Sequence, residues 1–227
     1  ATHPDAMGQG IFRRLTLGAL PALADMGVDA VFNTPNDKSR PGYLKMGWQI
    51  VGRVPVQARV TNPGAVLRMA RSRTGAQKMS AECDAGRPAG EVFSDGDATA
   101  ALLERQPAVE GITTDRSAAY LLWRYRLDHL RYRVVLAGDR LEDGAVVFRL
   151  RRRGDATEAA ICEVLEGRAG QRGLRAALRD VAAGSDADYL LSVRSANGRV
   201  SGFVPVPKAG PVLTWKPLST SRVPAIR

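Results

Sequence analysis

The sequence has few of the residues that build disulfides, metal sites and membrane spans. Its 227 residues include two cysteines, Cys83 and Cys162, and two histidines, His3 and His129. Two distant thiols do not make a disulfide framework, and so few His and Cys without clustering argue against a structural zinc site. No apolar run approaches the roughly 18–20 residues of a membrane span. We therefore expect a cytoplasmic protein that uses no metal and has no membrane partner.

Lysine is also scarce, although positive charge is not. The net charge is +10, and only five of the 33 basic residues are lysine. Such a charge is typical of a solvated basic surface, or of a protein that binds a polyanionic cofactor, an acidic substrate or nucleic acid. We interpret the densest run, RLRRRGD at 149–155, as an edge strand whose charges prevent aggregation. Nucleic-acid binding is the alternative interpretation of that run.

The first sixty residues alternate helix and strand. Apolar spacing predicts a helix over 11–26, bent or divided at Pro21, and then a buried strand over 28–33. A short helix from Pro41 to Met46 and a strand over 48–60 follow. This order indicates an α/β fold with parallel strands joined across a helix.

Residues 61–92 are rich in Pro and Gly, and they predict a connection with one helix around 64–71. A second helix and strand pattern begins near residue 93. It predicts helices over 97–106 and 115–127 with Asp97 and Asp115 as N-caps, strands over 132–139, 144–153 and 157–166 (the last equally a helix), a helix over 172–183, a strand over 187–195 and two strands within 198–218. The expected fold class is therefore α/β with a mixed sheet.

Two glycines stand directly before the first predicted helix, in GQGIFRR. The first amides of a helix lack partners, the helix dipole is positive there, and glycine lets the backbone approach an anion closely. Residues 8–12 could therefore hold a phosphate, with Arg13 adding charge; a plain turn into the helix is the alternative. Because Arg13 stands where a third glycine would be, the dinucleotide-binding fingerprint is absent, and so is a nucleoside-triphosphate loop.

The stretch NDKSRPGYLKMGW, residues 36–48, is more specific. It resembles the N-x-x-[AS]-x-x-x-Y-x-x-x-G-[FW] signature of the GCN5-related N-acetyltransferases at Asn36, Ser39, Tyr43, Gly47 and Trp48. HPDAMGQGIF, upstream, is similar to the loop of that family that binds the acetyl-CoA pyrophosphate, with departures at Met7 and Phe12. One helix and one strand separate the two motifs, as they do in the family.

The resemblance implies a domain division. It covers residues 1–56 and implies that the chain begins at the end of the family's fourth strand, without the family's first three strands. Residues 1–60 would then be the C-terminal half of a catalytic domain, 61–92 a connection, and 93–227 a second acetyltransferase-like domain without catalytic activity. The expected fold is a partial acyl-CoA N-acyltransferase fold followed by that second domain.

The resemblance also implies a chemistry. The protein would be an acyltransferase that moves an acetyl group from acetyl-CoA to an amine of a small molecule or a protein, although the chain by itself could be inactive. Tyr43 would be the acid that protonates the departing CoA thiolate, unless it only packs on its helix. Asn36 would face the cofactor cleft, unless it caps its own loop. The implied cofactor-binding residues are Thr2, His3, Gly8, Gln9, Gly10, Ile11, Phe12, Arg13, Asn36 and Ser39.

Two alternatives to an enzyme remain open. One is a non-catalytic acetyltransferase-like scaffold, which the departures at Met7 and Phe12 favour. The other is a basic nucleic-acid-binding protein, which the arginine excess favours, although we do not expect nucleic acid as the partner.

Overall fold

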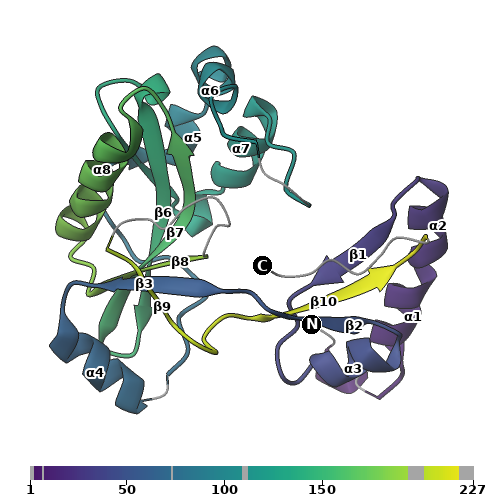
Figure 1. Cartoon of the computed structure of the whole chain (residues 1–227). Coiled ribbons are helices and arrows are strands. Elements are labelled where there is room, and N and C mark those ends of the chain that lie inside the picture. The colour runs from purple at the N-terminus through teal and green to yellow at the C-terminus, as the bar shows by residue number, and fades with distance from the viewer. Residues whose placement is uncertain (1–2, 7, 73, 109–111, 194–201, 220–227) are drawn as a thin grey trace. The chain divides into compact units, whose positions relative to one another are not determined.

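The computed structural model describes residues 3–6, 8–72, 74–108, 112–193 and 202–219. The chain folds into two compact units, shown in Figure 1: the first contains residues 1–55 and 207–227, and the second contains residues 56–206. The last strand of the chain thus folds with the first residues, whereas the sequence led us to group it with 93–227.

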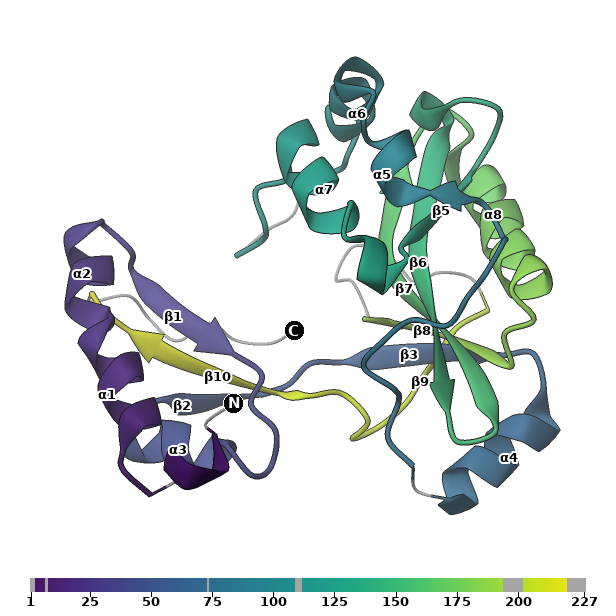
Figure 2. The same cartoon turned by 180° about the vertical axis from the view of Figure 1, so that it is seen from behind.

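The first unit is a three-stranded sheet with short helices along it (Figures 1 and 2). The strand order is β1-β10-β2, and both outer strands run antiparallel to the central one. The elements are η1 (Pro4–Ala6), α1 (Ile11–Gly18), α2 (Leu20–Asp25), β1 (Ala30–Asn33), α3 (Arg40–Lys45), β2 (Gln49–Arg53) and β10 (Val212–Pro217).

The predicted helix over 11–26 is two helices, α1 and α2, that meet at Ala19. Pro21 lies in the first turn of α2, where a residue without an amide hydrogen costs nothing. The predicted parallel strands β1 and β2 do run in the same direction, but they are not neighbours. The third strand between them, β10, lies far along the sequence, and local periodicity cannot reveal such a pairing.

The prediction of a single strand over 48–60 was wrong. This segment forms two strands, β2 and β3 (Val56–Val60), which belong to different sheets. Pro55 separates them, since proline cannot donate a ladder hydrogen bond. The amide of Val54, just before it, donates to the carbonyl of Pro211 (2.9 Å).

The second unit is built on a seven-stranded mixed sheet in the order β4-β5-β6-β7-β8-β3-β9. β7 and β8 pair in parallel, with α8 connecting them, and the other pairs are antiparallel. Within the described residues no helix is long and apolar enough to cross a membrane. The elements other than β3 are α4 (Pro63–Ser72), β4 (Arg87–Pro88), α5 (Ala89–Val92), α6 (Gly96–Leu103), α7 (Ala118–Tyr125), η2 (Asp128–Leu130), β5 (Arg133–Leu136), η3 (Leu141–Asp143), β6 (Gly144–Arg153), β7 (Ala156–Glu166), α8 (Gly170–Gly184), β8 (Tyr189–Val193) and β9 (Val204–Pro205).

Both predicted N-caps were wrong. α6 is capped by Asp95, whose carboxylate accepts the amide of the third helical residue (3.0 Å), and not by Asp97. α7 is capped by Ser117, whose hydroxyl accepts the equivalent amide (3.1 Å), and not by Asp115. In each case another capping residue lay two positions further along or back, and composition alone does not separate the two.

Helices cover both faces of this sheet (Figures 1 and 2). Successive side chains of a strand point to opposite faces. On β6, Val147 therefore packs in one core with α5, α6 and α7, whereas Val146 and Phe148 pack in another core with α8. All three side chains are fully buried, and this central hairpin of β6 and β7 holds the unit together.

The run RLRRRGD, which we predicted to be an edge strand, is not one. It ends β6, which lies between β5 and β7. Its arginines are used within the fold: the Arg149 guanidinium donates to the carbonyl of Lys78, and that of Arg153 donates to the carbonyl of Thr74 (2.9 Å). These hydrogen bonds occupy two of the arginines in a run whose sequence suggested contact with nucleic acid.

Arg151 forms a buried ion pair. Its guanidinium donates through Nε to Glu158 Oε1 (2.8 Å), and the Tyr189 hydroxyl donates to Glu158 Oε2 (2.6 Å). The Glu158 side chain is 1% exposed. Burial, and the hydrogen bond to Glu158, raise the pKa of Tyr189 above its usual range.

We expect Arg151→Ala to lower the free energy of unfolding by about 3 kcal/mol, because it leaves the Glu158 carboxylate buried without its cation. Urea denaturation followed by circular dichroism measures the change. Arg151→Ala together with Glu158→Leu should recover part of the loss, since the pair is then removed as a whole. A single variant as stable as the wild type would show that water replaces the lost partner.

Candidate functional site

The loop before α1 is open and left-handed. Gly8 and Gly10 have φ values of 78° and 68°, which glycine adopts at little cost. A Cβ atom at either position would meet nothing within 4 Å, so the space beside this backbone is free. Gly10 is the N-cap of α1, and among the described residues no side chain caps the helix. The first amides of α1 are thus available to an acceptor from outside the chain.

The start of α3 is ordered by Asn36. Its side-chain Oδ1 accepts the amides of Lys38 (3.1 Å) and Ser39 (2.9 Å), and also the Ser39 hydroxyl (3.0 Å). Asn36 therefore caps its own loop, which was the alternative interpretation of this residue. The cap fixes the turn that leads into Pro41, the second residue of α3.

A hollow of about 600 Å³ joins these two segments. The two predicted motifs therefore meet in space, although a helix and a strand separate them in sequence. The walls are mainly apolar, with a cationic side chain at Lys38. The lining residues are His3, Ala6, Ile11, Phe12, Leu15, Lys38, Ser39 and Gly42.

Tyr43 is not among the lining residues, although its neighbour Gly42 is, and its ring contacts two other aromatic rings. The Phe12 ring meets it edge to face, with centroids 5.1 Å apart and planes at 86°. The Trp48 ring also meets it edge to face, at 5.3 Å and 66°. Trp48 is 3% exposed. We call Phe12, Tyr43 and Trp48 the aromatic row; it connects α1, α3 and the residue before β2.

The remaining predicted site residues lie in or near the same loop. The Gln9 amide Nε2 donates to the carbonyl of Asp5 (3.3 Å) and is not part of the lining. The His3 Nδ1 lies 3.5 Å from the Asp5 carboxylate, and both side chains are exposed. Arg13 is exposed on the first turn of α1. Thr2 and Met7 fall outside the described residues.

The start of α8 has similar glycines in a different setting. The amides of Arg168 and Ala169 donate to the carbonyls of Glu142 (2.9 Å) and Asp143 (3.1 Å). A Cβ at Gly167 would lie 2.3 Å from the nearest backbone atom. The amides of Arg168 and Ala169 are therefore already used. The space is filled at Gly167 and Gly173, so these two glycines serve packing, whereas Gly170 has a φ of 57° and open space beside it.

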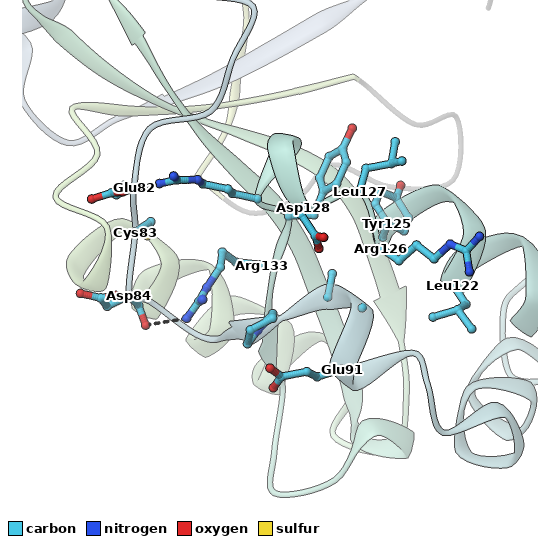
Figure 3. Close-up of a pocket in the computed structure, with 15 residues that line it drawn as sticks. Glu82, Cys83, Asp84, Glu91, Leu122, Tyr125, Arg126, Leu127, Asp128 and Arg133 are labelled. Carbon is cyan, nitrogen blue, oxygen red and sulfur yellow. Dashed lines mark hydrogen bonds and ion pairs between the residues drawn. The ribbon is translucent and has the colours of Figure 1, made fainter.

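A larger hollow, about 870 Å³, lies in the second unit (Figure 3). Its charged side chains have both signs, four acidic and three basic, so they do not favour a ligand of one charge. Arg131 pairs with Glu82 (2.7 Å), and Arg133 donates to three backbone carbonyls, including that of Asp84 (3.0 Å). Within the described residues no group of three or more His, Cys, Asp or Glu could hold a metal ion.

Sequence reasoning missed a buried polar cluster next to this hollow. The Tyr125 hydroxyl and the Arg116 guanidinium both donate to the Glu163 carboxylate, each at 3.0 Å. Burial, and then the Glu163 charge, raise the pKa of Tyr125 above its usual range. Burial also raises the pKa of Cys162 to about 11. No local pattern joins residues on α7, β7 and a loop, so the sequence held no signal for this cluster.

No model of a known protein family and no curated protein matches this sequence. Solved structures do match the fold. A GCN5-related N-acetyltransferase from Anabaena variabilis has a TM-score of 0.59 and 15% identity, with 95% of this chain and 53% of that chain covered. The chain has the GCN5-related N-acetyltransferase fold.

Two further structures with this fold are similar. A conserved protein from Enterococcus faecalis, described as a probable N-acyltransferase, has a TM-score of 0.54 and 16% identity over 96% of this chain and 53% of that one. Eis1 from Mycobacterium abscessus has a TM-score of 0.52 and 14% identity over 96% and 55%. This chain spans about half the length of each of these structures. The mixed α/β architecture expected from the sequence is confirmed.

Proposed function

We propose that the chain takes part in N-acetyl transfer from acetyl-CoA to an amine, with the cofactor held in the first unit. The observation that carries this proposal is the open left-handed loop of Gly8 and Gly10, at the start of a helix and beside a hollow. The fold supports an acyltransferase by analogy alone, since one structure that shares it is described as a GCN5-related N-acetyltransferase and another as a probable N-acyltransferase. The acceptor would be a small molecule or a protein.

The residues of the first unit fit a phosphorylated thioester. The amides at the start of α1 would donate to the pyrophosphate, with Arg13 adding positive charge at the same helix end. Lys38 would contribute a further cation from the opposite wall. The apolar walls from Ile11 and Phe12 suit the uncharged arm of the cofactor.

Tyr43 would supply the acid. Its hydroxyl would donate a proton to the thiolate that leaves when the amine attacks the thioester. Ser39 lines the hollow and holds the turn before α3, so its role would be structural support of the site.

Nucleic-acid binding has less support. The arginine run that suggested it is hydrogen-bonded inside the second unit, at Lys78, Thr74 and Glu158. Charge that is used within the fold contributes little to counterion release on a polyanion.

Calorimetry with CoA tests the proposal. We expect CoA to bind and pantetheine, which lacks the pyrophosphate, to bind at least tenfold more weakly, because each charge-assisted hydrogen bond contributes roughly 1.5–3 kcal/mol. Gly10→Val should abolish CoA binding, since its side chain fills the open space beside the loop.

Gly27→Val is the matched control. Gly27 also has a positive φ, of 80°, and open space around it, but it follows the end of α2 and so does not stand beside the first amides of a helix. It therefore has the same backbone strain without the contact. Equal affinity for CoA and pantetheine, or equal loss of binding in the two variants, would refute the assignment of the loop to the pyrophosphate.

A further inference from the structure

The aromatic row contains a residue with a second role. We propose that the Phe12 side chain is a positioning residue, which fixes the Tyr43 ring and thereby the direction of its hydroxyl. The inference rests on the proposed function of Tyr43, and it adds to that function the residue that orients the acid.

The contact is direct and close. Phe12 is the second residue of α1 and Tyr43 the fourth of α3, and their rings meet at 86° with centroids 5.1 Å apart. Such an edge-to-face pair is attractive beyond the effect of the area that it buries. The neighbouring Gly42 also lies close to Phe12, since a Cβ there would be at an ordinary van der Waals distance, 3.5 Å, from Phe12 Cε1.

The two rings that contact Tyr43 differ in burial. Trp48 is 3% exposed, and the Lys216 ammonium lies over its ring at 5.3 Å from the centroid. Trp48 is therefore the buried contact of Tyr43. Phe12 is 40% exposed, so its ring is the part of the row that a substitution can change without opening the core.

Phe12 also lines the hollow, whereas Trp48 does not. A ligand in the hollow would touch the same ring that holds Tyr43. The phosphate loop and the acid are therefore linked through one side chain, and occupancy of the hollow would restrict the Tyr43 ring further. Catalytic groups lose activity when their orientation is loosened, even when binding is unaffected.

The test uses Phe12→Leu, which keeps apolar bulk and removes the ring edge. Nuclear magnetic resonance of tyrosine labelled with ¹³C in the ring measures the flip rate of Tyr43, and Tyr43→Phe assigns its signal. We expect Phe12→Leu to raise the flip rate at least tenfold and to lower kcat by about 10- to 100-fold, with little change in the KM for acetyl-CoA. Phe12→Tyr keeps the ring and should restore both values.

Leu44→Ala is the matched control. Leu44 is 38% exposed on the same helix as Tyr43, does not line the hollow and is not part of the aromatic row. It should leave the flip rate and kcat unchanged. An unchanged flip rate in Phe12→Leu, an equal effect of Leu44→Ala, or a raised KM with unchanged kcat would each overturn the positioning role.

The flip rate separates this inference from the proposed function, because it needs neither cofactor nor turnover. A faster Tyr43 ring in Phe12→Leu, in a protein that binds no CoA, would support the positioning contact and refute the proposed function. Binding of CoA together with an unchanged Tyr43 flip rate in Phe12→Leu would support the proposed function and refute the positioning role.

Discussion

Tyr43→Phe is expected to lower the rate of acetyl transfer by about 10²- to 10⁴-fold, the usual range for one acid–base group. The variant keeps the ring, and with it the contacts to Phe12 and Trp48 at 5.1 and 5.3 Å, but removes the proton that the thiolate would take. The affinity for acetyl-CoA should barely change, because the hydroxyl acts on charge that forms in the transition state. Steady-state kinetics of an active form of the protein, with calorimetry of CoA binding, measure both quantities.

A structural role for Tyr43 predicts a different result. If the ring only fills space, Tyr43→Phe should change neither the rate of acetyl transfer nor the free energy of unfolding appreciably. A Tyr43→Phe variant with normal turnover would remove Tyr43 from the mechanism. A variant with lower stability and lower CoA affinity would indicate that the hydroxyl supports the fold.

Ending the chain after Val206 is expected to unfold the first unit and to leave the second intact. The central strand of the first sheet, β10, is then lost, and β1 and β2 have no partner in that sheet. Two short strands without a shared neighbour are not stable in water. The seven strands of the second sheet all lie within residues 56–206.

Tryptophan fluorescence distinguishes the two units. Trp48 is 3% exposed in the first unit, whereas Trp123 in the second is 61% exposed. The third tryptophan, Trp215, lies in β10 and is lost with it. In a background with both Trp123→Phe and Trp215→Phe, the emission of Trp48 should shift to longer wavelength when the chain ends at Val206, because Trp48 becomes solvated. Circular dichroism should still show cooperative unfolding of the second unit. Unshifted emission would mean that residues 1–55 fold without β10.

The sequence was sufficient to predict local structure. The spacing of apolar residues located α1, β1 and α3, and Gly8, Gly10 and Tyr43 marked two motifs in the order expected for the family. The sequence was insufficient to predict contacts between residues that are far apart in the chain. Thr214 of β10 bonds to Asn33 of β1, and these residues are 181 apart in the chain. No pattern within a window of 20 residues contains that pairing, so the sheets and the two units could not be assigned.

The site shows the same division. The position of the glycine loop at a helix start was predictable, since glycines before an amphipathic helix are a local signal. The cap by Asn36 was one of two interpretations that the sequence left open, and the ring contact of Phe12 was not predictable, because it depends on the direction of a side chain rather than on residue type. Similarly, the arginines of β6 looked free in sequence because the carbonyls that they bond, such as those of Thr74 and Lys78, lie more than 70 residues away.

The place of β10 in the first sheet also has a consequence for the order of synthesis. On the ribosome, β1 and β2 emerge early, but their common neighbour follows only after the whole second unit. At about 5–20 residues per second, some 160 intervening residues take roughly 8–30 s. During that time both strand edges are unpaired and can recruit other nascent chains. The second unit can fold while the sheet of the first is still incomplete. The yield of soluble protein in cells should therefore depend on chaperones that bind the segment containing β1 and β2.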